Sequence, residues 1–178
     1  MRRYDVLCNL IKATIGSPKL GAEIGIWKGQ TSARLLRNNP NLHLLMIDPY
    51  VAYHAGRKRG PVTSIAKDQE TMHKIMVMAL KGTHFAKERR TVLVSRSELA
   101  ATIISDGSLD FIFDDGDHSY EGATGDIAEA LRVAKKVVGV HDTNQNYPGP
   151  RDAITNLFTH QAGYWVKGCR GIWLCNLD

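Results

Sequence analysis

The chain has 178 residues, 43% of them hydrophobic and 23% charged, which is the balance of one folded globular domain rather than of a disordered chain. Its formal net charge of +5 comes from one region, because residues 54–90 hold nine Lys or Arg against three Asp or Glu. No apolar run approaches the length of a membrane span, and the opening residues lack the apolar stretch of a signal peptide, so we expect a cytoplasmic protein with no membrane partner.

Helical and strand-like patterns alternate along the chain. Apolar residues at helical spacing predict a first helix over residues 2–16, in an N-terminal segment of residues 1–19 where Gly16 and Pro18 stop it. Further helices are predicted over residues 31–38, 63–81, 96–105, 120–134 and 150–161. Strands are predicted over residues 20–26, 43–48, 91–95, 109–114, 136–142, 164–167 and 171–176.

This order predicts an α/β fold in a single domain that spans residues 1–178. Strands that alternate with helices need crossover connections, so the seven-stranded sheet should be mostly parallel, with helices on both faces. The last two strands have no helix between them, and we expect a hairpin that adds an antiparallel edge. The basic residues 50–90 are expected to form a lid-like insertion over the site.

The first strand-to-helix turn carries the pattern Glu23-x-Gly25-x-x-x-Gly29, which differs from the glycine fingerprint of dinucleotide-binding proteins. Glycines let a ligand approach the backbone, and the following helix start offers free N–H groups. The acid would repel a diphosphate but would suit a ligand with a cationic amine and a sulfonium. The alternative is that Gly25 and Gly29 serve only the structure of the loop and bind no ligand. Asp48 ends the second strand, where such sheets present a carboxylate to ribose hydroxyls, unless it only caps a turn.

Two polar clusters follow the fourth and fifth predicted strands. The first brings Asp114, Asp115, Asp117 and His118 within five positions, and the second is His141-Asp142-Thr143-Asn144. Carboxylates so close together destabilise a fold unless something positive compensates them. The compensating charge could be a metal ion, a ligand amine or nearby arginines.

Together these motifs resemble the class I S-adenosylmethionine-dependent methyltransferases, in particular the group of macrocin-type O-methyltransferases and cephalosporin-hydroxylase-like proteins. The resemblance covers residues 20–176. The Glu23–Gly29 turn is similar to the first cofactor motif, FIFDDGDHSYEG to the run IDGDHSYEG, and HDTN…YPGPRDAI to HDY…PGV…AV. It implies a Rossmann-like fold and methyl transfer from S-adenosylmethionine to the hydroxyl of a small-molecule acceptor.

The resemblance also implies which residues bind the cofactor. The methionine portion is expected near Glu23, the ribose near Asp48, and the adenine and reacting end near residues 95–97 and 115–118. The full expected set is Glu23, Gly25, Ile26, Trp27, Gly29, Thr31, Ser32, Asp48, Pro49, Arg96, Ser97, Asp115, Gly116, Asp117 and His118.

Two schemes for removing the acceptor proton stay open, with His118, His141 and Asp142 as the expected catalytic residues. In the first, Asp115 and Asp142 bind a divalent ion such as Mg²⁺, whose third ligand would come from Asn144 or Asp117 because Thr143 replaces the asparagine of catechol-type relatives. In the second, His118 or His141 is the general base.

The sequence leaves the acceptor and the assembly open. A cationic lid favours an anionic small molecule, whereas a nucleic-acid methyltransferase or binding module using residues 54–90, and a cofactor-binding protein without methyl transfer, are the alternatives. A homodimer could form through an exposed edge strand or the first helix. The three cysteines lack paired spacing and are expected to be packing residues: Cys8, Cys169 and Cys175.

Overall fold

The computed structural model describes residues 2–52, 68–158, 163–166 and 171–177. Its strands are β1 Leu20–Ile24, β2 His43–Ile47, β3 Arg90–Leu93, β4 Leu109–Asp114, β5 Ala134–His141, β6 Gly163–Val166 and β7 Ile172–Asn176. Its helices are α1 Arg3–Thr14, α2 Gln30–Asn38, α3 Gln69–Gly82, the 3₁₀ helix η1 His84–Arg89, α4 Ser97–Ala101, α5 Tyr120–Val133 and α6 Pro148–Leu157. The cationic loop of residues 53–61, the start of the predicted third helix and Cys169 lie outside the described residues.

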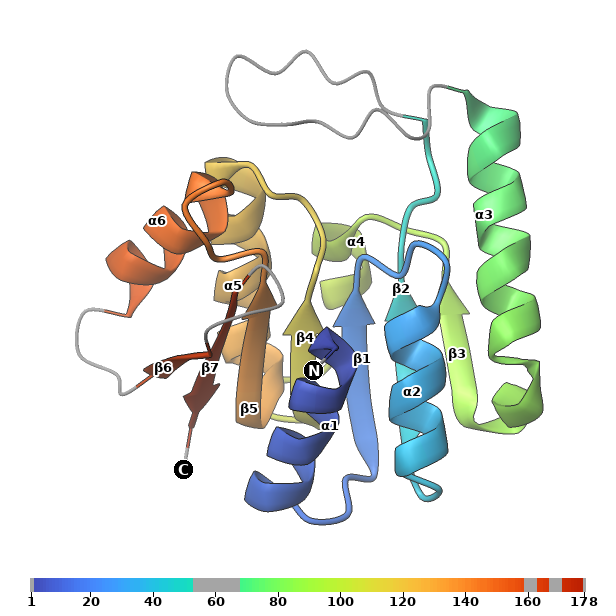
Figure 1. Cartoon of the computed structure of the whole chain (residues 1–178), viewed down its shortest axis with the longest axis horizontal. Helices are drawn as coiled ribbons and strands as arrows, with labels where there is room; N and C mark the ends of the chain where they lie inside the picture. The colour runs from blue at the N-terminus through green and yellow to red at the C-terminus, as the bar shows by residue number, and fades with distance from the viewer. Residues whose placement is uncertain (1, 53–67, 159–162, 167–170, 178) are drawn as a thin grey trace.

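The strands form one seven-stranded sheet in the order β3-β2-β1-β4-β5-β7-β6 (Figure 1). The first five strands are parallel, and β7 runs antiparallel to both β5 and β6. The predicted mostly parallel sheet, its closing hairpin and its antiparallel last strand are therefore confirmed.

The hairpin lies at the edge of the sheet, as predicted, but its antiparallel strand is not the edge strand. β7 lies between β5 and β6, so the edge strand β6 runs in the same direction as β1 to β5. Apolarity explains this order: Ile172, Trp173 and Leu174 of β7 are buried, whereas Tyr164 and Trp165 of β6 are 45% and 46% exposed. The more apolar strand takes the place with a neighbour on each side.

Helices cover both faces of the sheet, as predicted. In Figure 1, α1 and α2 lie in front of it and α3 stands beside β3. The apolar faces of these three helices share one core with side chains that include Phe111 and Phe113. The second core joins α4, α5 and α6 to the other face. Cys8 packs in the first core and Cys175 in the second, as expected for packing residues. None of the helices in the described ranges is long and apolar enough to cross a bilayer.

Two arginines of the basic segment serve the fold. Arg89, at the end of η1, donates hydrogen bonds to the carbonyl oxygens of Leu36, Asn39 and Leu42, around the C-terminus of α2. Arg90 donates to the carbonyl oxygen of Leu80 at the end of α3. Cations at helix C-termini neutralise free carbonyl groups and the negative end of the helix dipole. Part of the local positive charge is therefore used inside the protein.

The carboxyl ends of β1, β2, β4 and β5 meet at one edge of the sheet, and strained backbone follows three of them. Trp27 after β1, Tyr50 after β2 and Asp142 after β5 have positive φ angles of 52°, 45° and 52°. Such conformations are unfavourable for side-chain-bearing residues and cluster at functional sites. This edge holds the candidate active site.

Candidate active site

Glu23 lies on β1 beneath the first turn and is 1% exposed. Its Oε2 accepts a hydrogen bond of 2.5 Å from the Oγ of Ser32 in α2. Burial raises the pKa of Glu23 to about 8, and the nearby Asp115 and Asp48 add to the rise, although the Ser32 hydrogen bond and Arg3 oppose it. Burial therefore keeps Glu23 protonated near neutral pH unless a cationic group lies beside it.

The two glycines of the first turn each have a packing reason. Gly25 has a φ of 79°, and a Cβ atom built there would lie 2.1 Å from the carbonyl oxygen of Asp115. Gly29, with a φ of 72°, is the N-cap of α2 and would place a Cβ 3.0 Å from Ala79 of α3. The first turn therefore packs closely against the loop that follows β4, at Asp115, and against α3. A contact of these glycines with a cofactor stays a prediction.

Asp48 ties the turn after β1 to the turn after β2. Its Oδ2 accepts the N–H of Trp27 at 3.0 Å and its Oδ1 accepts the N–H of Tyr50 at 2.8 Å. Burial raises the pKa of Asp48, against the opposing effect of these backbone donors. The backbone N–H of Ile26 is a third donor to this carboxylate, so one of its four lone pairs remains for a ligand hydroxyl while Asp48 holds the turns.

Four side chains from the ends of β4 and β5 converge. Nδ1 of His141 lies 2.8 Å from Oδ1 of Asp115 and 3.0 Å from Oδ1 of Asp142. Nε2 of His118 lies 3.4 Å from Oδ2 of Asp142 and 3.7 Å from Oδ1 of Asp115. One ligand atom from each of the four residues falls within 4.8 Å of the others. This carboxylate–imidazole cluster unites the two motifs that the sequence singled out.

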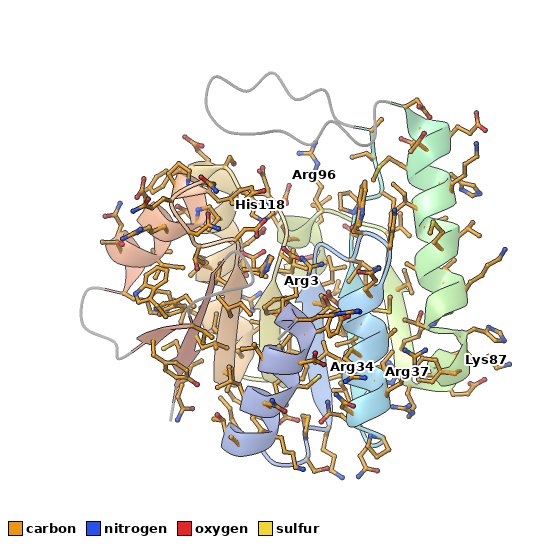
Figure 2. All side chains as sticks on the ribbon, in the orientation of Figure 1. Arg3, Arg34, Arg37, Lys87, Arg96 and His118 are labelled. Atoms are coloured by element: carbon orange, nitrogen blue, oxygen red, sulfur yellow. The ribbon has the colours of Figure 1, made fainter. Side chains whose placement is uncertain are left out.

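Arg3 of α1 provides a positive charge for this cluster. Its Nη1 lies 2.7 Å from Oδ2 of Asp115, whose side chain is 7% exposed. Figure 2 shows Arg3 extending from the start of α1 toward the strand ends, where His118 also lies. Although burial alone would raise the pKa of Asp115, His118, His141 and Arg3 together lower it. Arg3 is therefore a nearby arginine of the kind that the sequence offered as one of three cation sources.

Asp114 does not join this cluster. As the last residue of β4 it is 3% exposed and accepts the N–H of Gly116. Asp126 of α5, which accepts a hydrogen bond from Ser97, lies close enough to raise the pKa of Asp114 further, after the larger effect of burial. Alternation explains the split, because consecutive side chains at a strand end face opposite sides of the sheet.

Replacing Asp126 with asparagine is expected to raise stability at neutral pH. Burial raises the pKa of Asp126 to about 6, so the folded state keeps a proton that the unfolded chain loses between about pH 4 and pH 6. Ionisation therefore lowers the stability of the wild type as the pH rises through this window. We expect Asp126→Asn to be more stable by roughly 1–3 kcal/mol at pH 7.5, with the difference vanishing near pH 4.

Urea unfolding at the two pH values measures this effect. Asp152→Asn, at an exposed position of α6, is the matched control and should change stability little at either pH. An Asp126→Asn protein less stable than the wild type at pH 7.5 would contradict the expected sign.

The other residues expected at the cofactor have varied surroundings. Ile26 is buried in the first core, and Trp27 packs against it. The buried Oγ1 of Thr31 makes no hydrogen bond within the described ranges. Arg96 is exposed and pairs with Glu98 at 3.8 Å, Oδ1 of Asp117 accepts the N–H of Ser119, and Gly116 packs closely over Ile24. Pro49 is partly buried beside Asp48.

The sequence did not identify several residues of this site. Arg3 is far from Asp115 in sequence, and only the excess of negative charge signalled that some cation was needed. The ring of Tyr147 lies against His118, with 5.3 Å between ring centroids. Tyr50 is buried and donates its hydroxyl to the carbonyl oxygen of Trp27. Tyr147 belongs to a quoted motif, so its proximity to the second cluster was an available signal.

Comparisons with known proteins identify the family and the fold of the chain. The family model described as a methyltransferase domain matches residues 22–143. The solved O-methyltransferase TomG from Streptomyces achromogenes, in complex with S-adenosylmethionine, has 15% identity and a TM-score of 0.69, covering 98% of this chain and 78% of that chain. The O-methyltransferase from Bacillus cereus, in complex with S-adenosylhomocysteine, has 15% identity and a TM-score of 0.66, covering 99% and 80%.

A methyltransferase from Geobacter sulfurreducens has 16% identity and a TM-score of 0.67, covering 100% of this chain and 80% of that chain. The comparison with curated protein sequences gave no match. At these identities the solved structures show a shared fold.

Proposed function

The chain belongs to the methyltransferase-domain family and is a class I S-adenosylmethionine-dependent methyltransferase, and on this basis we propose that it methylates a hydroxyl group of a small molecule. The observation that carries the proposal is the cluster of Asp115, His118, His141 and Asp142, near Glu23 at the carboxyl end of β1. These residues combine groups that can accept a proton with groups that suit a cationic methyl donor.

The cofactor is proposed to lie across the first turn. Glu23, protonated when buried alone, would become ionised beside the methionine amine, and the unpaired Oγ1 of Thr31 offers a further polar contact. Asp48 would accept a ribose hydroxyl with the lone pair that its three backbone donors leave. The sulfonium makes the methyl group electrophilic, so the protein must chiefly align the acceptor and remove its proton.

His118 is the proposed general base. Its Nε2 makes no hydrogen bond among the described residues and faces Asp142, which would stabilise the imidazolium after proton transfer. His141 is more enclosed, with no side-chain exposure, and its Nδ1 faces the carboxylates of both Asp115 and Asp142. We assign His141 the role of holding these carboxylates in position.

The cluster also fits a divalent metal ion. Two carboxylates and two imidazoles with ligand atoms within 4.8 Å form a mixed oxygen and nitrogen set. This set suits Mn²⁺ as well as the Mg²⁺ expected from the sequence, because imidazole is a good ligand for transition metals. Asp115, Asp142 and His118 would hold the ion, which when bound would polarise an acceptor hydroxyl as a Lewis acid.

The described part of the basic segment gives little support to nucleic acid as the acceptor. Lys74 pairs with Glu70 at 2.6 Å and Lys87 with Glu88 at 3.5 Å, while Arg89 and Arg90 bond to backbone carbonyls. Local pairing reduces the field that would attract a phosphate backbone. We therefore propose a small molecule rather than a nucleic acid as the acceptor.

Transfer of a labelled methyl group from S-adenosylmethionine to a panel of catechols, other phenols and sugars tests the proposal. We expect label in at least one hydroxyl product. His118→Asn should lower the turnover by about 10²- to 10⁴-fold, the range for loss of a general base, while calorimetric binding of S-adenosylhomocysteine is unchanged.

His43→Asn is the matched histidine control, since His43 lies at the start of β2 and contacts Thr91. It should retain wild-type turnover. Cofactor binding without label in any acceptor would favour a protein that binds the cofactor without methyl transfer. Full activity in His118→Asn would remove its role as the base.

A further inference from the structure

Both oxygens of Asp115 are engaged inside the protein. Nη1 of Arg3 lies 2.7 Å from Oδ2, and Nδ1 of His141 lies 2.8 Å from Oδ1. The Arg3 side chain is 23% exposed and that of Asp115 is 7% exposed, so solvent screens this pair only weakly. The guanidinium therefore holds a carboxylate that the proposed metal site requires.

Charge limits what can share the site with Arg3. Asp115 and Asp142 carry two negative charges and Arg3 one positive charge, so with neutral imidazoles these groups leave one negative charge. A divalent ion bound to Asp115 would lie beside the guanidinium and repel it in a poorly solvated place. Removing Arg3 would instead leave two carboxylates to balance one divalent ion.

In the part of the chain that the structure describes, few contacts hold the first turn of α1 to the rest of the protein, so this turn could detach without the rest of the helix. Besides the Arg3 contact, Asp5 pairs with Arg34 of α2 at 2.9 Å in more exposed surroundings. The N-cap Arg2 makes no capping side-chain hydrogen bond among the described residues. Further along, Leu7 and Ile11 are buried in the core and anchor the rest of the helix. Detaching Arg3 would therefore free one turn rather than the whole helix.

We propose that Arg3 and a divalent metal ion exclude one another at the Asp115 carboxylate, so that metal binding releases the first turn of α1. This inference rests on the proposed function, because it concerns the same site, and it adds a regulatory role for a residue outside the family motifs. Arg3 then acts as an internal cation that keeps the acidic site stable until a metal ion replaces it.

Titration with Mn²⁺ in the absence of cofactor tests this competition. Free Mn²⁺ is followed by electron paramagnetic resonance for the wild type, Arg3→Gln and Arg2→Gln. We expect Arg3→Gln to bind Mn²⁺ about tenfold or more tightly than the wild type, within the usual range of coupling between sites. Arg2→Gln removes a neighbouring arginine that contacts Tyr4 instead, and it should bind like the wild type.

Hydrogen exchange provides a second readout. The N–H groups of Asp5 and Val6 bond to the carbonyl oxygen of Arg2 in the first turn. Mn²⁺ should accelerate their exchange in the wild type, whereas in Arg3→Gln their exchange should be fast already and Mn²⁺ should add little. Protection of Leu7 and Ile11 should persist in both proteins and would show that the variant is folded.

Three results would overturn the proposal: Arg3→Gln binding Mn²⁺ no more tightly than the wild type, Arg2→Gln matching the gain, or no binding by any variant at millimolar Mn²⁺. The labelled-methyl assay separates this failure from failure of the proposed function. Tighter Mn²⁺ binding without methyl transfer would leave the competition standing and remove the activity. Methyl transfer by the wild type, with no change of Mn²⁺ affinity in Arg3→Gln, would support the proposed activity and contradict the competition.

Discussion

Gly25→Ala is expected to lower the free energy of unfolding by roughly 2–5 kcal/mol and to disturb the site. An alanine there would adopt a left-handed backbone at a cost of roughly 1–2 kcal/mol. Its Cβ would also lie 2.1 Å from the carbonyl oxygen of Asp115, so the β4 loop must shift, and crowding of this kind costs roughly 1–3 kcal/mol more.

Gly16→Ala is a matched control that separates the two costs. Gly16 has nearly the same φ, 77°, but a Cβ built there meets nothing within 4 Å. Its substitution should cost only about 1–2 kcal/mol, the conformational part. Urea unfolding followed by tryptophan fluorescence measures both variants. Equal losses of unfolding free energy at the two positions would contradict this prediction. They would show that the loop after β4 can move away from residue 25 without a measurable loss of stability.

Asp48→Ala is expected to weaken binding of S-adenosylhomocysteine by at least about 100-fold. The substitution would remove the proposed acceptor of the ribose hydroxyls, and hydrogen bonds to a charged group contribute roughly 1.5–3 kcal/mol each. It would also leave the N–H groups of Trp27 and Tyr50 without their acceptor, loosening two turns that hold positive φ angles.

Asp110→Ala distinguishes ligand binding from general damage. Asp110 is a buried acid that also accepts two backbone N–H groups, those of Lys19 and Leu20, but it lies at the amino end of β4. Both variants should lose stability, by roughly 1–3 kcal/mol. Only Asp48→Ala should lose affinity in a calorimetric titration. An equal loss of affinity in both, or none in Asp48→Ala, would contradict the placement of the ribose.

Local patterns were sufficient for the sheet because each strand is recognisable from its own residues. The all-buried run of β4 and the alternation with amphipathic helices indicated a parallel sheet, and the short gap between the last strands indicated a hairpin. Strand order was harder to predict. β7 lies between β5 and β6 because its apolar side chains are buried at that position. This burial depends on the whole sheet rather than on either strand alone.

The candidate site divides in the same way. The sequence placed acids and histidines at the ends of parallel strands, and topology brings such ends to one edge, so the meeting of Asp115 and His118 with His141 and Asp142 could be expected. The residue pattern alone grouped Asp114 with Asp115, and only the family resemblance selected Asp115, although strand alternation puts the two on opposite faces. The packing reason for Gly25 could not be read either, because the atom that it accommodates belongs to the β4 loop.

By itself, the sequence determined the order of strands and helices, the edge of the sheet that carries the polar groups, and the family. These features follow from hydrophobic periodicity and short motifs, which act over a few residues. Only the tertiary structure decided which cation meets Asp115 and which of the two histidine side chains is partly exposed. Such choices depend on distance and burial between residues far apart in the chain, and electrostatic interactions are strong only where folding has excluded water.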